Sequence, residues 1–77
     1  MDIHLADVTI HIDETLDPAR RGEIETQIRA VDGVVSVHSA DRTPHLAIVE
    51  YNPEKTTSSV ILDTVTAQGV HAEMIGL

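Results

Sequence analysis

The sequence contains one pattern twice: an alternating apolar run, a run of apolar residues at helical spacing, a glycine, and a second alternating run. The first copy comprises Val8, Ile10, Ile12, Ile24, Ile28, Val31, Gly33, Val35 and Val37, and the second Ala47, Val49, Tyr51, Ile61, Val65, Gly69, Val70, Ala72 and Met74. Alternation marks strands, and spacing of three or four marks one helix face. The repeat therefore predicts the order strand, helix, strand, strand, helix, strand.

Local signals set the expected limits of these elements. Asp17 followed by Pro18 is typical of a helix start, and Asp32-Gly33 of a helix end. Thr56 or Thr57 is expected to cap the second helix, which Gly69 ends. The strands are expected at about residues 7–13, 34–40, 45–51 and 70–76. Right-handed crossovers then place both helices on one face of a four-stranded antiparallel sheet with strand order four, one, three, two.

Size and charge restrict the class of protein. Seventy-seven residues suffice for a single domain, residues 1–77, in which nearly every aliphatic side chain is needed for the core. Thirteen acidic residues against five basic ones give a net charge of -8, which disfavours nucleic acid and anionic lipid as partners and favours a basic protein or a cation. There is no cysteine, no membrane-span-length apolar run and no leader-like N-terminus. We therefore expect a cytoplasmic protein.

The sheet face that the helices leave uncovered carries the candidate functional residues. By alternation it displays Thr9, His11, Asp13, Ser36, His38, Ala40, Leu46, Ile48, Glu50, His71, Glu73 and Ile75. We call this surface the open face.

Several short motifs resemble one known family. Residues 49–53 (Val-Glu-Tyr-Asn-Pro), the helix with Ile61 and Val65, and residues 68–72 (Gln-Gly-Val-His-Ala) look like the second half of a heavy-metal-associated domain, the ferredoxin-like module of copper chaperones and metal-pump N-termini. The first helix and the following Gly-Val also match that family. The resemblance extends from about Val8 to Met74 and implies a ferredoxin-like α+β sandwich.

The resemblance also implies a metal loop, Met-x-Cys-x-x-Cys, before the first helix. Its three ligand positions correspond here to Thr15, Asp17 and Arg20. None is a thiol or thioether, and a carboxylate with a guanidinium does not suit Cu(I). We therefore expect no copper site at this loop, which is better suited to helix capping.

Histidines on the open face suggest a different metal site. His11, His71 and Glu73 are expected on neighbouring strands, and such ligands suit Zn(II), Ni(II) or Cu(II). Their affinity would fall below about pH 6, where imidazoles protonate. His38 lies too far away, two strand spacings or about 10 Å, to share the ion. The alternative interpretation is that these are simply exposed strand histidines.

An interaction surface is the competing hypothesis. Leu46, Ile48 and Ile75 are aliphatic side chains on the face without helices, and His38, Glu50 and Glu73 surround them. Such a patch is typical of a homodimer interface or a site for a basic protein partner.

Catalysis is not expected. The sequence has no glycine-rich phosphate loop and no nucleophile with an identifiable base, and the adjacent acids Asp13 and Glu14 would point to opposite sides of a strand. We therefore expect a binding or interaction module rather than an enzyme.

Overall fold

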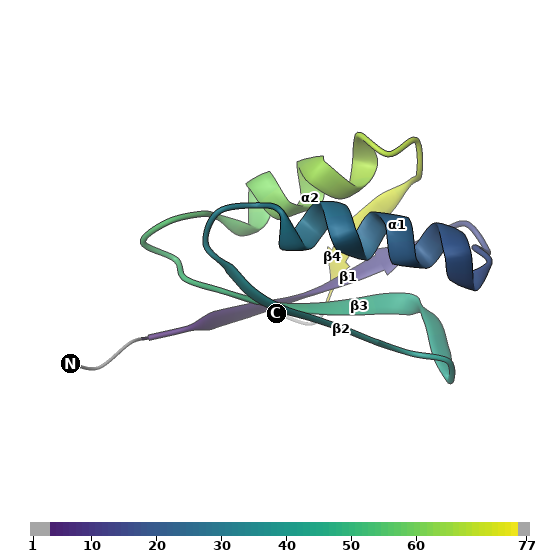
Figure 1. The fold of residues 1–77 in the computed structure, drawn as a ribbon, viewed down its shortest axis with the longest axis horizontal. Helices are drawn as coiled ribbons and strands as arrows, with labels where there is room; N and C mark the ends of the chain where they lie inside the picture. The colour runs from purple at the N-terminus through teal and green to yellow at the C-terminus, as the bar shows by residue number, and fades with distance from the viewer. Residues whose placement is uncertain (1–3, 76–77) are drawn as a thin grey trace.

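Two helices lie on one side of a four-stranded antiparallel sheet in the computed structural model, which describes residues 4–75 (Figure 1). The elements are β1 (Ala6–Ile12), α1 (Pro18–Arg29), β2 (Val34–Ala40), β3 (Thr43–Tyr51), α2 (Ser58–Thr66) and β4 (Ala72–Ile75). The sheet order is β2-β3-β1-β4. This confirms the predicted fold class and strand order.

Both helices begin where capping chemistry predicts. The Asp17 side chain accepts a hydrogen bond from the Arg20 backbone N–H at 2.7 Å, and Pro18 occupies the first helical position of α1. At α2 the cap is Thr57, whose hydroxyl accepts from the Val60 N–H at 3.2 Å. These caps satisfy backbone donors that have no partner within the helix.

Gly33, between α1 and β2, is required for two reasons. Its φ of +103° lies in the left-handed region that favours glycine. A Cβ at this position would also lie 2.8 Å from Cβ of Lys55. The Gly33 carbonyl accepts from the Asn52 N–H at 2.7 Å, which ties this turn to the end of β3.

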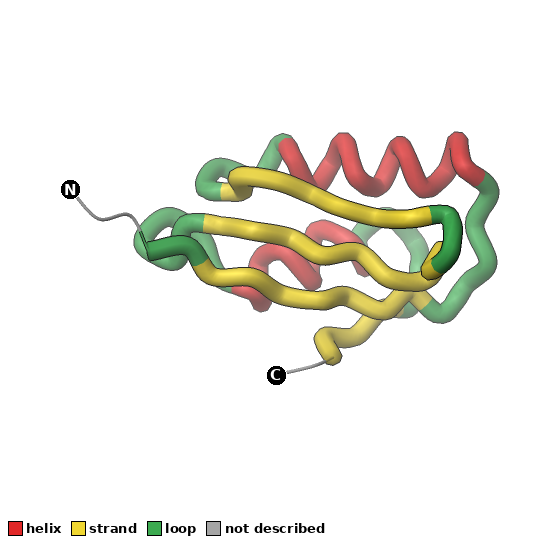
Figure 2. Tube along the Cα trace, turned by 90° about the horizontal axis from the view of Figure 1, so that it is seen from below, coloured by secondary structure: helices red, strands yellow, loops and turns green. Residues whose placement is uncertain are grey.

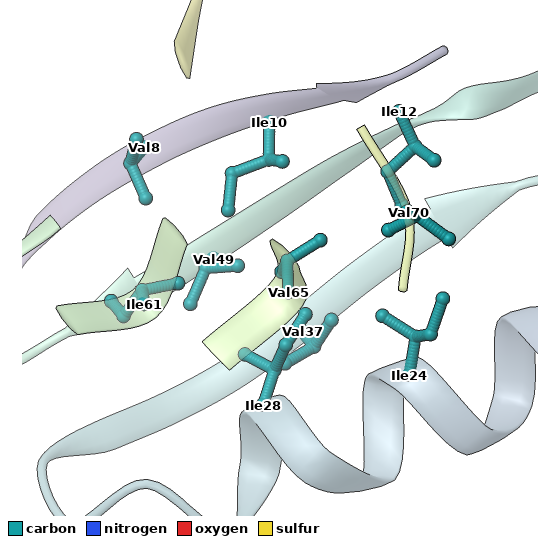
Figure 3. Packing of buried hydrophobic residues seen from close by; sticks show 10 residues of the cluster. All are labelled: Val8, Ile10, Ile12, Ile24, Ile28, Val37, Val49, Ile61, Val65 and Val70. Atoms are coloured by element: carbon teal, nitrogen blue, oxygen red, sulfur yellow. The ribbon is translucent and has the colours of Figure 1, made fainter. Parts of the chain in front are cut away.

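The core lies between the helices and the sheet (Figure 3). Its residues come from β1, β2, β3, both helices and the segment before β4, and they comprise Val8, Ile10, Ile12, Ile24, Ile28, Val37, Val49, Ile61, Val65 and Val70. Val8, Ile10 and Ile12 occupy alternate positions of β1, so the intervening residues of that strand face the other way. The core therefore determines which side chains reach the open face.

Strand β2 departs from simple alternation. Val34 pairs with Tyr51 and Ser36 with Glu50, so Val35 is an extra residue opposite a single β3 position. Val35 is consequently 57% exposed, although the sequence pattern placed it with buried Val37.

Three predicted strands have displaced limits. β1 begins and ends one residue earlier than predicted, so Asp13 lies just beyond it. β3 starts at Thr43 and includes Pro44, which lies beyond the residues that pair with β1. β4 starts at Ala72, two residues later than predicted. The predicted end of this strand at about Gly76 lies outside the described residues.

The open face has no described element across it. Figure 2 views the sheet from the side opposite to the helices, with the strands in front. Within residues 4–75, neither helix is long and apolar enough to cross a membrane.

Candidate functional site

Three side chains with metal-binding atoms meet at the edge of the open face. His11 is on β1, Asp13 directly follows that strand, and Glu73 is on β4 opposite His11. Nδ1 of His11 lies 3.0 Å from Oε1 of Glu73 and 3.2 Å from Oδ1 of Asp13. One ligand atom from each residue lies within 4.8 Å of the other two.

This geometry leaves one nitrogen facing two acceptors. Carboxylate oxygens accept hydrogen bonds, so a neutral His11 must carry its proton on Nδ1 to bond to either one. A single N–H cannot point well at both oxygens. A metal ion in place of that proton would contact the nitrogen and both oxygens together.

His45 constrains the His11 ring. The two imidazole rings stack with centroids 5.7 Å apart and an interplanar angle of 18°. Nδ1 of His45 lies 2.7 Å from the Ile12 carbonyl oxygen, so Nδ1 is the protonated nitrogen that donates. This bond holds His45 against His11, and sequence reasoning had assigned no role to His45.

His71 does not join His11, which corrects the predicted trio of His11, His71 and Glu73. Because β4 starts after His71, the residue lies in the preceding segment and its ring bonds to Glu14: Nδ1 is 2.7 Å from Oε2. Glu14 also accepts from the His71 backbone N–H at 2.8 Å. Asp13, rather than His71, is the third residue grouped with His11 and Glu73.

The Glu14–His71 contact shifts both pKa values. The hydrogen bond to the Glu14 carboxylate raises the pKa of His71 above its ordinary value. The hydrogen bond from the His71 side chain, followed by that from its backbone, lowers the pKa of Glu14. The charged forms of both groups are therefore favoured.

The aliphatic residues proposed for an interface lie on the open face. Ile48 is 45% exposed and Ile75 is 38% exposed, while Leu46 is half-buried. His38 pairs with Ile48 across β2 and β3, and both His38 and Glu50 are exposed. The Ser36 hydroxyl donates to Oε1 of Glu50 at 2.7 Å.

Residues at the copper-loop positions have structural contacts. Asp17 caps α1, and the Arg20 guanidinium donates to the Gln68 backbone carbonyl beyond α2. Arg20 also lies 3.7 Å from the Glu23 carboxylate. Thr15 is exposed in the loop. Arg20 therefore connects α1 to the segment after α2, and the three positions offer no soft ligand for Cu(I).

Several solved structures have the same fold as this chain. A copper-binding domain from HMA7, a P-type ATPase, has a TM-score of 0.82 at 18% identity, covering 91% of this chain and 93% of that one. Oxidized MerP from Ralstonia metallidurans CH34 has a TM-score of 0.82 at 20% identity, covering 92% of this chain and 97% of MerP. This chain has the heavy-metal-associated fold. The N-terminal domain of PacS from Synechocystis PCC6803 shares that fold. Its TM-score is 0.78 at 24% identity, covering 92% of this chain and 98% of the PacS domain.

Sequence comparison does not extend this structural similarity. No protein-family model matches the chain, and no curated protein matches it. The sequence also lacks cysteine altogether, so it has no thiolate for a soft metal. The resemblance stated from the sequence is confirmed at the level of the fold and of the missing thiols.

A usable signal for Asp13 was present in the sequence. His11 and Asp13 are two residues apart at the end of a strand, a spacing that places both side chains on one face. His45 had no such local signal, because its contact with His11 arises between neighbouring strands.

Proposed function

We propose that this chain is a non-enzymatic module that binds one borderline divalent metal ion, Zn(II), Ni(II) or Cu(II), through His11, Asp13 and Glu73. The observation that carries the proposal is the convergence of two carboxylates on Nδ1 of His11, at 3.0 and 3.2 Å. Two ligands of one tetrahedral zinc ion lie about 3.3 Å apart, given bond lengths near 2.0 Å. The nitrogen-to-oxygen spacings already match this value.

The donor set selects the class of ion. One imidazole and two carboxylates suit borderline ions, whereas Cu(I) prefers thiolates and Ca(II) or Mg(II) prefer oxygen ligands alone. Asp13 and Glu73 are about half exposed, with side-chain exposures of 51% and 56%. Both can therefore rotate toward an ion, and water can complete its coordination.

Two structural features support binding at this edge. Stacking on His45 restricts the tilt of the His11 ring plane, which reduces the entropy lost on coordination. The chain has a net charge of -8, and a divalent cation between two carboxylates would lower their mutual repulsion.

The test is isothermal titration calorimetry with native mass spectrometry on untagged protein. We expect one Zn(II), Ni(II) or Cu(II) per chain and no heat with Mg(II). Removing a ligand in His11→Ala or Glu73→Gln should weaken binding more than about 100-fold, because the loss of a residue that only hydrogen-bonds to a ligand typically weakens it by about 10- to 100-fold.

His71→Ala is the matched control. It removes a histidine that also contacts a carboxylate, but one outside the converging group. Equal loss of affinity in His71→Ala and His11→Ala would refute the proposed ligand set. Absence of bound metal in the unmodified protein would refute the function.

A further inference from the structure

The basic residues of the molecule all lie outside the strands of the sheet. None of the four strands contains lysine or arginine. The basic residues are all elsewhere: Arg20, Arg21 and Arg29 on α1, Arg42 in the β2–β3 turn, and Lys55 between β3 and α2. The open face therefore presents carboxylates and histidines without a fixed positive charge.

An apolar strip, defined as Leu46, Ile48 and Ile75, crosses the middle of this face. Thr9 on β1 pairs with Ile48 on one side and Ile75 on the other, so the strip extends over β3, β1 and β4. Beside it is a shallow hollow lined by His38, Ser39, Ala40, Thr43, Leu46 and Ile48. Covering exposed aliphatic surface of this kind with another protein surface is favourable, because it removes apolar area from water.

Carboxylates lie at both ends of the open face, on either side of the strip along the direction of the strands. At one end Asp7 and Glu50 are directly opposite each other across β1 and β3, and both are exposed. Like charges in that relation are destabilising. At the other end are Asp13 and Glu73 with His11. Asp7 and His11 are four residues apart on β1, which corresponds to about 13 Å.

We propose that the open face is a docking surface for a cationic amphipathic segment of another protein. Aliphatic side chains of that segment would cover the apolar strip, and lysine or arginine would neutralise the carboxylates at both ends. Charge complementarity favours a cationic partner over a second copy of this chain. A second copy would bring a further net charge of -8 and the same acidic ends. The proposal does not depend on metal binding.

The experiment uses two synthetic helical peptides of about 18 residues, or five turns. One contains leucine and lysine, and the other has glutamate in place of every lysine. Binding to the full chain is followed by anisotropy and by amide NMR shifts, in EDTA so that no metal contributes. We expect the lysine peptide alone to bind, with shifts centred on Thr9, Ile48 and Ile75, and the affinity to fall as salt rises.

Two double variants with the same net charge distinguish binding at the open face from non-specific electrostatic attraction. Asp7→Asn with Glu50→Gln should raise Kd about three- to tenfold, the loss expected for two exposed ion pairs. Glu54→Gln with Asp63→Asn, in the β3–α2 loop and on α2, should leave Kd unchanged. Ile48→Ser should weaken binding and leave the fold intact.

Three results of the binding experiments would overturn the proposal. These are equal effects of the two charge variants, equal binding of the glutamate peptide, and NMR shifts confined to the helices. A dimer mass for the free protein that Ile48→Ser reduces to a monomer would assign the face to a second copy instead.

Discussion

At the start of α2, two adjacent threonines have opposite environments. Thr56 is 7% exposed, and its Oγ1 has no hydrogen-bond partner among the described residues. Thr57 is exposed and caps the helix. A buried hydroxyl without a partner loses its hydration and gains nothing in return, whereas a capping hydroxyl satisfies a free N–H.

Replacing each threonine with valine should therefore change stability in opposite directions. Thr56→Val should raise the free energy of unfolding by about 1 kcal/mol, because it removes the unsatisfied hydroxyl at nearly constant volume. Thr57→Val should lower it by about 1 kcal/mol through loss of the cap. Urea denaturation measures both, and a destabilised Thr56→Val protein would mean that the hydroxyl is hydrogen-bonded in solution.

At the scale of elements, the Glu14–His71 contact joins the loop after β1 to the segment before β4. The Asp13 backbone N–H also donates to the His71 carbonyl at 2.9 Å. These bonds extend the pairing of β1 with β4 beyond the last strand residues. The side-chain hydrogen bond between them is strongest when both groups are charged.

The pH dependence follows from the two pKa shifts. The pKa of His71 is raised, so its contribution to stability is complete below its ordinary value of 6.5 and is lost as pH rises through the folded-state value. The pKa of Glu14 is lowered, so its contribution is complete above 4.5 and is lost as pH falls through the folded-state value. The pair should therefore stabilise the fold most between pH 4.5 and 6.5.

Thermal unfolding of His71→Gln across pH checks this expectation. The variant should melt below the unmodified protein at about pH 5.5, and the difference should shrink at about pH 8.5, where imidazole is neutral. His38→Gln is the control, since no described carboxylate pairs with His38. A difference in melting temperature that stays constant with pH would show that the charged pair contributes nothing.

For the whole molecule, net charge is the dominant electrostatic feature. The charge is -8 and the radius of gyration is 11.9 Å. Screening extends over about 10 Å at 0.1 M salt and about 30 Å at 0.01 M. At low salt every carboxylate therefore repels the others across the fold, with only five basic residues to compensate.

Added salt should therefore stabilise this protein. Between about 0.01 and 0.3 M NaCl we expect the melting temperature to rise, by about 4–8 °C for each kcal/mol of repulsion removed. Glu54→Lys with Asp63→Lys changes the net charge from -8 to -4, since each reversal adds two units. Its melting temperature should rise less, and an equal rise would assign the salt effect to something other than net charge.

The elements of this fold could be predicted because their signals are local. Alternation of Val8, Ile10 and Ile12 acts between immediate neighbours, and the Asp17-Pro18 start is decided within one helical turn. The bulge at Val35 was missed because it depends on how β2 pairs with Tyr51 and Glu50, which are distant in sequence.

The sequence by itself determined the layers of the sandwich and the face that stays open, because apolar periodicity marks most core side chains and right-handed crossovers place both helices on one side of the sheet. Only the tertiary structure decided which polar side chains meet on that face. Asp13 joins His11 and Glu73, and His45 stacks on His11. His71 bonds to Glu14 instead. The ends of the strands and the paths of the loops bring these side chains together, although some are 62 positions apart in the sequence. Such contacts depend on a few ångströms of backbone placement, which the packing of the whole chain sets.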